Sequence, residues 1–548
     1  MNIAELQEAI AGALPEFECL IYGERRMTWA EVNDRTQRLA AYLRKQDFGI
    51  RKERADLTNW QSGQDHIALY MYNGNEYLES MLGAFKCRAT TINVNYRYKE
   101  DELVYLLEDS ESQGIIFHAQ FAPMLDNLRS RLPNIRLWIQ VDDGSGEGML
   151  EGALDYEQVL ADTAPAPMDT DASSDDLYMV YTGGTTGMPK GVLWRQHDML
   201  FSLISQQPQD TSIEQFVQAA RHKANQDVVG KSMPLAPMMH ASGSCMAFGA
   251  WLRGDAVVLQ KTADRFDAEE IVSTMEREKV NHATLIGDAF AQPLLKEMDH
   301  KSYDLSAMSF INSGGAVLSE HNKQRLQEHM PNLTLLDAVG SSEAGRQAVS
   351  IYTSGGTNKS LNFKMLENSC VVNYDCDRIL RAPEKEPGWV AQGGHIAMGY
   401  LNDADKTRRT FPVIDGMRYA IPGDRARLDD NGGFQFLGRE SITINSGGEK
   451  VFAEEVELAI KSLQGIEDTQ VVGIPSREWG QKVVALVATH ARADLDENSI
   501  TAHCRDAISA YKVPKHVVFV EQISRGPNGK ADYKWAKETA LSQLGVAE

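Results

Sequence analysis

The sequence predicts an α/β fold, with a large N-terminal domain built on a mainly parallel sheet and a smaller α+β domain at the C-terminus. At 548 residues, the chain is too long to fold around one hydrophobic core, so two or more domains are expected. Strand-like and helix-like segments alternate through its first half, which is typical of a parallel sheet with crossover helices. A compact α+β pattern of about a hundred residues, a usual size for a domain, follows residue 438. We therefore predict domains at 1–437 and 438–548.

The first half supplies the alternating elements. Residues 28–43 are predicted to form a helix, because Thr28 and Glu31 match a capping box and apolar residues recur on one helical face. A polar, proline-bearing connector at 163–176 leads into a short apolar strand at 177–181. Between them we predict a strand around Ile67, Leu69 and Met71, a helix at 77–85, a strand at 91–95, a helix at 101–107 and a strand at 114–117.

The last part of the chain changes character. Residues 416–436 alternate turn residues with short apolar pairs, which predicts a small β-region. A boundary is expected near 438–441. Beyond it we predict a strand at 441–445, a helix at 453–463, strands at 468–474 and 482–489, a helix at 498–507 and a strand at 516–520.

Composition excludes some classes of function. The net charge of −22 argues against nucleic acid as a partner, since phosphate binding needs a basic surface. A polyanionic substrate must therefore meet a local group of donors or a metal ion. The six cysteines are scattered, and we expect reduced thiols in a cytoplasmic protein. We expect no signal peptide and no transmembrane segment, while peripheral membrane contact and a homodimer stay open.

A glycine- and threonine-rich loop at 181–191 (YTGGTTGMPKG) follows the strand at 177–181. Glycines let backbone N–H groups turn toward an anion, and threonine hydroxyls and Lys190 add donors and charge. The loop therefore predicts phosphate binding. It does not match GxxxxGK[ST], and no GxGxxG follows the first strands, so neither a P-loop NTPase nor a dinucleotide-binding fold is indicated.

The loop resembles the phosphate loop of the adenylate-forming superfamily, which contains acyl-CoA synthetases, luciferases and amino-acid-adenylating domains. Further segments resemble that family's motifs in the same order. They are NSGGA at 312–316, GSSE at 340–343, PGDR at 422–425, GR at 438–439, GGEKV at 447–451 with EEVE at 454–457, and PNGK at 527–530.

This resemblance implies a reaction in two halves. A carboxylate attacks the α-phosphorus of ATP to give acyl-AMP and pyrophosphate, and the thiol of CoA then displaces AMP. Lys530, carried on a mobile C-terminal domain, is expected to bridge carboxylate and α-phosphate, while Glu343 and Thr185 hold Mg²⁺. His240 matches the histidine at the mouth of the acyl pocket, although a hydrogen-bonded core histidine is the competing interpretation.

The resemblance also implies residues that bind nucleotide or CoA. Asp424 is expected to accept hydrogen bonds from the ribose with help from Arg439, and residues 447–450 are expected to line the path of the thiol. The full set is Thr182, Gly183, Gly184, Thr185, Thr186, Gly187, Lys190, Gly314, Gly315, Ala316, Asp337, Ser342, Asp424, Arg439, Gly447, Gly448 and Lys450.

Some positions depart from the family pattern. Val339 stands where an aromatic residue often stacks on adenine, so nucleotide binding is expected to differ there. Pro422 replaces the usual threonine, Ala453 replaces a common proline, and Ser441 takes the hinge position. Domain rotation is still expected, because a hinge needs only residues that tolerate changes of φ and ψ.

Three functions remain open from the sequence. The favoured one is an ATP-dependent acyl-CoA ligase, similar to bacterial ligases for fatty acids or steroid side-chain acids. The absence of a carrier-protein segment after Lys530 favours CoA as the acceptor. The alternatives are an adenylate-forming enzyme that passes its acyl group to a carrier protein or oxidises it, and a non-catalytic nucleotide sensor. The sequence does not identify the acid.

Overall fold

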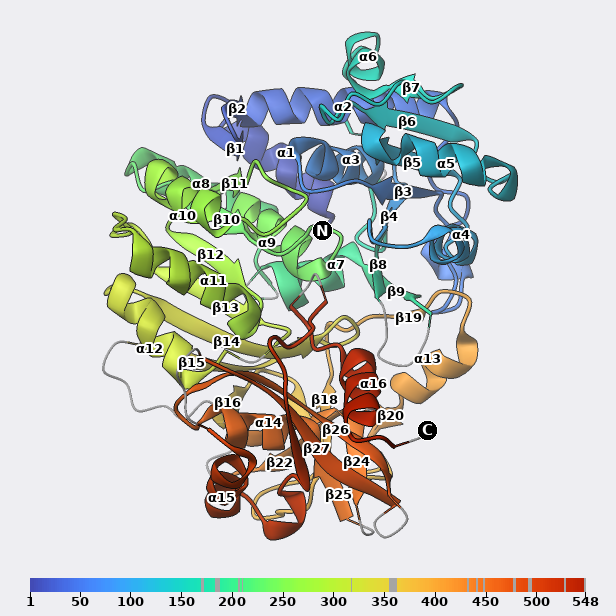
Figure 1. The fold of residues 1–548 in the computed structure, drawn as a ribbon. Coiled ribbons are helices and arrows are strands. Elements are labelled where there is room, and N and C mark those ends of the chain that lie inside the picture. Colours follow the sequence, from blue (N-terminus) through green and yellow to red (C-terminus); the bar gives the residue numbers. More distant parts are fainter. Residues whose placement is uncertain are drawn as a thin grey trace.

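The structure is a computed structural model. It describes residues 1–168, 172–182, 188–205, 207–208, 210–316, 318–353, 362–430, 433–439, 442–446, 449–476, 480–490, 495–526 and 529–546. In Figure 1 two large sheets with their helices form the upper and middle parts of the molecule, and the C-terminal strands lie below them. This is the predicted α/β class with a smaller α+β part. Among the described residues, no helix is both long enough and apolar enough to cross a membrane.

The first sheet is parallel throughout. Its strands come in the order β4-β3-β5-β6-β7, and its central strands are buried on both faces, which explains their unbroken apolar runs. The alternation predicted over residues 67–117 is confirmed to within a few residues at each end, and the elements of this sheet after residue 118 were not predicted. The elements are β3 (His66–Tyr70), α3 (Asn75–Lys86), β4 (Thr90–Asn93), α4 (Glu100–Asp109), β5 (Gly114–His118), α5 (Ala122–Leu128), β6 (Leu137–Val141), β7 (Leu154–Asp155) and α6 (Tyr156–Ala161).

The second sheet is longer and mixed. Over the described residues it has 13 strands, in the order β17-β18-β22-β23-β16-β15-β14-β13-β12-β10-β11-β1-β2. Strands β1, β11, β10, β12, β13 and β14 run parallel, and β15 turns back antiparallel to β14. The predicted small β-region is present, but its strands β22 and β23 continue this sheet through β16.

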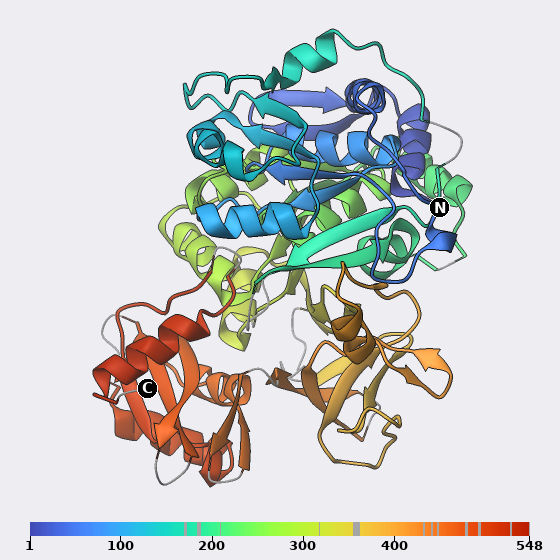
Figure 2. The same ribbon diagram turned by 90° about the vertical axis from the view of Figure 1, so that its right-hand side faces the viewer.

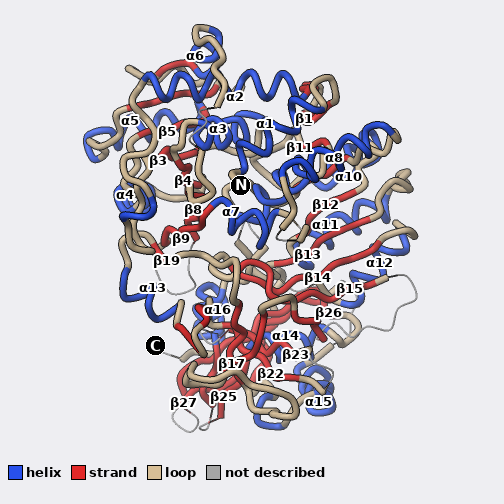
Figure 3. The backbone as a smooth tube through the Cα atoms, turned by 180° about the vertical axis from the view of Figure 1, so that it is seen from behind, coloured by secondary structure: helices blue, strands red, loops and turns tan. Residues whose placement is uncertain are grey.

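The strands of this sheet are β1 (Glu18–Tyr22), β2 (Arg25–Thr28), β10 (Lys231–Pro234), β11 (Ala256–Leu259), β12 (His282–Leu285), β13 (Phe310–Gly314), β14 (Thr334–Ser341), β15 (Gly345–Tyr352), β16 (Asn362–Met365), β17 (Ser369–Val372), β18 (Gly388–Gln392), β22 (Asp424–Leu428) and β23 (Phe434–Arg439). Figure 3 shows α8, α10, α11 and α12 along one side of its strands. The helices are α8 (Ile213–Asn225), α9 (Ala241–Leu252), α10 (Ala268–Glu278), α11 (Gly287–His300) and α12 (Glu320–His329).

A three-stranded sheet joins these two bodies. Strands β8 and β9 pair antiparallel on either side of the glycine loop, and β19 pairs with β9. The loop residues 183–187 themselves lie outside the described residues. The elements here are β8 (Leu177–Thr182), β9 (Lys190–Arg195), α7 (Gln196–Met199), β19 (Gly399–Tyr400), α13 (Ala404–Thr410), β20 (Val413–Ile414) and β21 (Met417–Arg418).

Two helices near the N-terminus pack on this framework. The predicted helix is confirmed as α2 (Trp29–Lys45), and Thr28 and Glu31 form the expected capping box. An unpredicted helix, α1 (Ile3–Ala13), precedes it and has its own capping box from Asn2 and Glu5. Both helices place their apolar faces in the same buried cluster.

The C-terminal part has its own sheet, in the order β25-β24-β27-β26 with β28 beside β27. In Figure 2 it lies beside the small β-region beneath the large sheets. Every element predicted here is present, and β25 and α16 are additional. The domain boundary at 437/438 stays a prediction. The elements are β24 (Thr443–Ser446), β25 (Glu449–Phe452), α14 (Ala453–Lys461), β26 (Ile466–Ser476), β27 (Gly480–Thr489), α15 (Glu497–Ala507), β28 (His516–Phe519) and α16 (Tyr533–Gln543).

Candidate active site

A cavity of about 380 Å³ opens where β8, α9 and the strands β12 to β15 meet. The carboxyl ends of the parallel strands β12 and β13 face it, which is the usual place for a ligand in an open α/β sheet. Residues from distant parts of the chain share its wall. The predicted site residues among them are Thr182, His240, Gly314, Gly315, Ser342 and Lys530.

Lys530 reaches the cavity from the C-terminal part on a tight turn. The N–H of Gly526 donates to the carbonyl of Lys530 at 2.8 Å, and the N–H of Gly529 donates to the carbonyl of Gly526 at 2.9 Å. Gly529 has φ +68°, and a Cβ there would lie 2.9 Å from Cγ2 of Ile286. Glycine is therefore required for this close approach to the cavity wall.

The far end of the Lys530 side chain lies along the loop after β13. Its Cε is 3.9 Å from where a Cβ of Gly315 would stand. Gly315 has φ +82°, in the region that favours glycine, so the turn exposes its backbone to the cavity. Ala316 comes next in the chain and packs against the core below β13.

His240 precedes α9 on the opposite side of the cavity. Burial lowers its pKa to about 4, and the charge of Lys530 contributes to the decrease, so the imidazole is neutral at pH 7. Its Nε2 is buried and has no hydrogen-bond partner among the described residues. A fully hydrogen-bonded core histidine would not show this, so the geometry favours a contact with a ligand.

Glu343 lies beside β19 and is not among the described residues that line the cavity. The hydroxyl of Tyr400 donates to its Oε1 at 2.7 Å, and Tyr400 lies in β19, next to β9. Burial, then Glu343, raises the pKa of Tyr400, so the phenol remains a donor. Lys406 Nζ lies 3.9 Å from the centre of the Tyr400 ring, and Lys190 Nζ lies 3.9 Å from Oδ2 of Asp403.

The carboxylate of Glu343, in the turn between β14 and β15, can bind a Mg²⁺ ion that takes most of its ligands from phosphate oxygens and water, while Lys190 and Lys406 can pair with the phosphates. Among the described residues, no group of three or more His, Cys, Asp or Glu could hold a metal ion without such help. Thr185, the other predicted ligand, lies outside the described residues, as do Gly183, Gly184, Thr186 and Gly187.

Asp424 and Arg439 are brought opposite one another. They are Cα partners in the antiparallel pair β22 and β23, and Asp424 is buried. Gly447 and Gly448 lie outside the described residues, and Lys450 is described only by its backbone in β25.

Asp337 does not line the cavity, and its predicted role in nucleotide binding stays a prediction. It lies in β14, and its Oδ2 forms an ion pair with Lys323 Nζ at 3.0 Å. Burial raises the pKa of Asp337 to about 6 although Lys323 opposes the shift. A buried ion pair with α12 explains this residue without a ligand.

Comparisons with known proteins decide the family. The model described as "AMP-binding enzyme" matches residues 7–401, and that described as "AMP-binding enzyme C-terminal domain" matches residues 455–530. The chain belongs to the AMP-binding enzymes. The medium-chain acyl-CoA ligase Mig of Mycobacterium avium is 44% identical over 547 residues, covering 99% of this chain and 98% of that protein. The resemblance stated from the motifs is therefore confirmed.

Other relatives agree in length and fold. The medium/long-chain-fatty-acid–CoA/3-oxocholest-4-en-26-oate–CoA ligase of Mycobacterium marinum is 35% identical, covering 98% of this chain and 96% of that protein. The solved structure of the anthranilate CoA ligase AuaEII with anthranoyl-AMP superposes with a TM-score of 0.81 at 20% identity, covering 100% of this chain and 98% of that one. These relatives place this AMP-binding enzyme in the acyl-CoA ligase branch.

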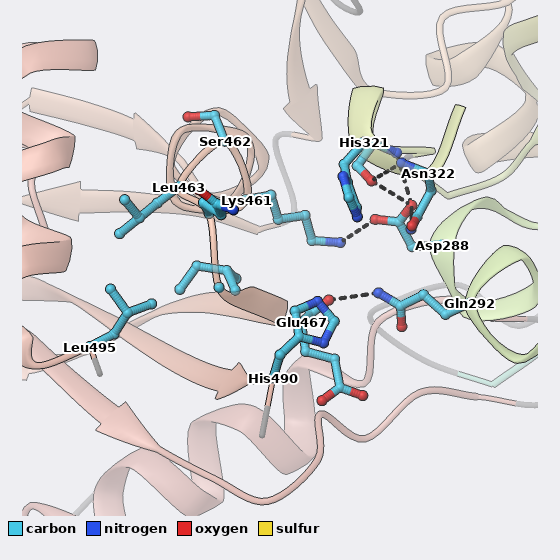
Figure 4. Close-up of a pocket in the computed structure, with 14 residues that line it drawn as sticks. Asp288, Gln292, His321, Asn322, Lys461, Ser462, Leu463, Glu467, His490 and Leu495 are labelled. Carbon is cyan, nitrogen blue, oxygen red and sulfur yellow. Dashed lines mark hydrogen bonds and ion pairs between the residues drawn. The ribbon is translucent and has the colours of Figure 1, made fainter. Parts of the chain in front are cut away.

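A chain of ion pairs, missed in the sequence, joins the Lys530 turn of this AMP-binding enzyme to α11. Arg525 donates to both carboxylate oxygens of Asp468, at 2.6 and 2.7 Å. Lys461 Nζ lies 2.9 Å from Oδ1 of Asp468 and 3.2 Å from Oδ2 of Asp288. In Figure 4 the Lys461 side chain extends from α14 toward Asp288, at the edge of a cleft of about 660 Å³.

Further hydrogen bonds and charges stabilise Asp288 and Lys461 in this chain of ion pairs. Oδ1 of Asp288 accepts hydrogen bonds from Ser319 N at 2.8 Å and Asn322 Nδ2 at 2.7 Å. Burial alone would lower the pKa of Lys461, but Asp288 and Asp468 outweigh it and raise the pKa. Nearby, Gln292 Nε2 donates to the carbonyl of Glu467 at 2.7 Å, which is drawn in Figure 4. Only the three-dimensional structure brings these distant residues together.

Proposed function

We propose that this protein activates a hydrophobic carboxylic acid with ATP and transfers the acyl group to CoA. The observation that carries the proposal is the position of Lys530. A turn that requires glycine holds it at the wall of a cavity that Gly315 and His240 also line. Such a cation can lie between a carboxylate and a phosphate, where its charge is most stabilising in the transition state.

In the first half-reaction a carboxylate oxygen attacks the α-phosphorus, the bond to pyrophosphate breaks, and acyl-AMP forms. Lys530 neutralises charge shared by the two anions and fixes their approach. Neutral His240 orients the carboxylate as a hydrogen-bonding group and adds no charge. Mg²⁺ held by Glu343 and Thr185 would reduce the negative charge of the phosphates. In the second half-reaction the sulfur of CoA attacks the acyl carbon and AMP leaves.

The remaining assignments follow the ordered motifs. We assign the pyrophosphate to the loop 183–187 with Thr182 and Lys190, and the ribose to Asp424 and Arg439. Ser342 and residues 314–316 are assigned to the adenine side. Residues 447–450 line the thiol path after the domain 438–548 has rotated against the domain 1–437.

The acid is inferred from the relatives. Because the similar ligases carry names for medium-chain and long-chain fatty acids and for an oxo-steroid acid, we infer an apolar acid of that size range. Six free cysteines support a cytosolic location. A homodimer stays a prediction that sedimentation would settle.

Release of pyrophosphate across a panel of aliphatic, aromatic and steroid acids, with and without CoA, tests the proposal. Pyrophosphate should depend on acid, ATP and Mg²⁺, and the acyl-CoA thioester should form when CoA is added. Lys530→Ala should abolish adenylation, and normal turnover by that variant would refute the assignment. Pyrophosphate exchange without a thioester product would favour transfer to a carrier protein instead.

A further inference from the structure

A lysine of α13 that belongs to none of the sequence motifs lies close to the proposed Mg²⁺ ligand. Lys406 Nζ is 3.9 Å from the centre of the Tyr400 ring, and the hydroxyl of Tyr400 donates to Oε1 of Glu343 at 2.7 Å. One tyrosine therefore contacts the ammonium with its ring face and the carboxylate with its hydroxyl. This arrangement brings the charge of Lys406 near the carboxylate of Glu343.

The backbone of Lys406 is also fixed relative to β9. Asp403 is the N-cap of α13, and its Oδ1 accepts a hydrogen bond from the backbone N–H of Lys406 at 3.0 Å. The other oxygen of this carboxylate, Oδ2, lies 3.9 Å from Nζ of Lys190. The N–H of Leu401 donates to the carbonyl of Gly191 at 2.8 Å. The segment that carries Lys406 is therefore held against the strand that carries Lys190.

The ammonium of Lys406 forms no ion pair and no hydrogen bond with any residue that the structure describes, and the Tyr400 ring is its contact. Burial lowers the pKa of Lys406, Glu343 and Asp403 oppose the decrease, and Lys190 adds to it. An aromatic face attracts a cation less strongly than a hydrogen-bonded anion does, so it replaces only part of the lost hydration. The ammonium is therefore able to donate to an anionic ligand.

Lys406 differs in this respect from lysines that stabilise the fold. Lys86 is fully buried, and its Nζ lies 3.1 Å from Oε1 of Glu8. Lys512 Nζ lies 2.5 Å from Oε1 of Glu455. Each of these charges is neutralised within the protein, as is expected of a buried lysine with a structural role. The ammonium of Lys406 has no such carboxylate within ion-pair distance among the described residues.

We propose that Lys406 binds the β- and γ-phosphates of ATP and, with Lys190, the pyrophosphate formed from them. The inference rests on the proposed ligase activity and adds a phosphate-binding residue to it. When the bond between the α-phosphorus and the bridging oxygen breaks, the electron pair stays on pyrophosphate, and the ammonium neutralises part of that charge. Tyr400 links this cation to Glu343, so phosphate and Mg²⁺ are bound by connected side chains.

Equilibrium binding separates the outer phosphates from the rest of the nucleotide. The probes are α,β-methylene-ATP, which cannot release pyrophosphate, and AMP, which lacks the β- and γ-phosphates. Both are titrated with Mg²⁺ by isothermal titration calorimetry. Lys406→Met keeps the length of the side chain and removes its charge. We expect the Kd of α,β-methylene-ATP to rise roughly tenfold, as for loss of a hydrogen bond from a charged group, and the Kd of AMP to stay unchanged.

Kinetics supply a second readout and a matched control. Inhibition of adenylation by pyrophosphate should weaken by a similar factor in Lys406→Met. Thioester formation from a preformed acyl-adenylate and CoA should be unchanged, because no pyrophosphate takes part in it. Lys406→Arg should restore part of the binding. Arg408→Met is the control on the same helix, since the Arg408 side chain is 63% exposed and pairs with Asp405 at 2.8 Å.

The outcomes separate the inference from the proposed function. If the wild type binds neither probe and activates no acid, the ligase assignment itself fails. If Lys406→Met changes the Kd of both probes equally or of neither, or if Arg408→Met gives the same selective loss, the role of Lys406 is refuted while the ligase assignment stands. Thermal unfolding identifies a variant that fails to fold, and Lys406→Gln then replaces Lys406→Met with the same expected selectivity.

Discussion

An ion pair between Lys461 and Asp288 is expected to control the first half-reaction. Lys461 Nζ lies 3.2 Å from Asp288 Oδ2, and the two side chains are only 8% and 4% exposed. Asp288→Asn keeps an acceptor for Ser319 and Asn322 but removes the charge. Lys461 retains Asp468 at 2.9 Å, so the expected loss is that of one hydrogen bond to a charged group, about 1.5–3 kcal/mol, and not the larger cost of an isolated buried charge.

That loss should weaken the contact that holds the Lys530 turn at the cavity wall. A change of 1.5–3 kcal/mol corresponds to a decrease of roughly tenfold to a hundredfold in the rate of adenylation, followed as ATP–pyrophosphate exchange. Thioester formation from a preformed acyl-adenylate and CoA should change much less, because attack of the thiol on the acyl carbon does not use Lys530. The split between the two half-reactions is the decisive readout.

A matched control lies inside the C-terminal part. Lys512 Nζ pairs with Glu455 at 2.5 and 2.7 Å, and this buried pair does not reach α11. Lys512→Met should therefore lower stability without a selective effect on adenylation. Equal losses in both half-reactions for Asp288→Asn, or the same split in Lys512→Met, would refute the positioning role of Lys461 and Asp288.

Three more outcomes are expected. Tyr400→Phe removes the hydrogen bond to Glu343 and should raise the Mg²⁺ concentration for half-maximal activity about tenfold; an unchanged Mg²⁺ titration would contradict the assigned role of Glu343. Gly529→Ala places a methyl group 2.9 Å from Ile286 at φ +68° and should slow pyrophosphate exchange by roughly tenfold, and undiminished exchange would mean that the turn can move. Burial raises the pKa of Glu457 from 4.5 to about 6, so the folded state binds this proton more tightly and loses stability as the pH rises from 4.5 to 6. In thermal unfolding, Glu457→Gln should be more stable than the wild type by about 2 kcal/mol at pH 8 but not near pH 4. Equal differences at both pH values would exclude this cause.

Local patterns predicted elements of the first sheet and of the C-terminal part, but none of the parallel strands of the 13-stranded sheet. The helix α2 was predicted because Thr28 and Glu31 match a capping box, and β3 because apolar residues cluster at Ile67, Leu69 and Met71. Strands β6 and β7 of the same sheet were not predicted. The helix α1 carries the same signal in Asn2 and Glu5, so it could have been predicted. The position of β22 and β23 in the large sheet could not be predicted, since the hydrogen-bonding partner of a strand is a long-range property.

The site shows the same division between local and long-range information. Ordered motifs named Lys530, His240 and Gly315, which the fold brings to one cavity. The ion pair of Asp337 with Lys323 could not be predicted, because the sequence around the GSSE segment does not indicate which side chain of α12 lies beside this carboxylate.

Residues 286–288 take part both in the cavity wall and in the contact with the C-terminal part. Ile286 lines the cavity and also lies against Gly529. Arg525, four residues before Gly529, holds the Lys530 turn through its ion pair with Asp468. Gly287 follows with φ +54°, and Asp288 then binds Lys461. An acid that contacts and displaces Ile286 therefore displaces the same short segment that binds the C-terminal part through Asp288. Because close-packed interiors transmit such displacements instead of absorbing them, occupancy of the cavity and the seating of Lys530 should be coupled.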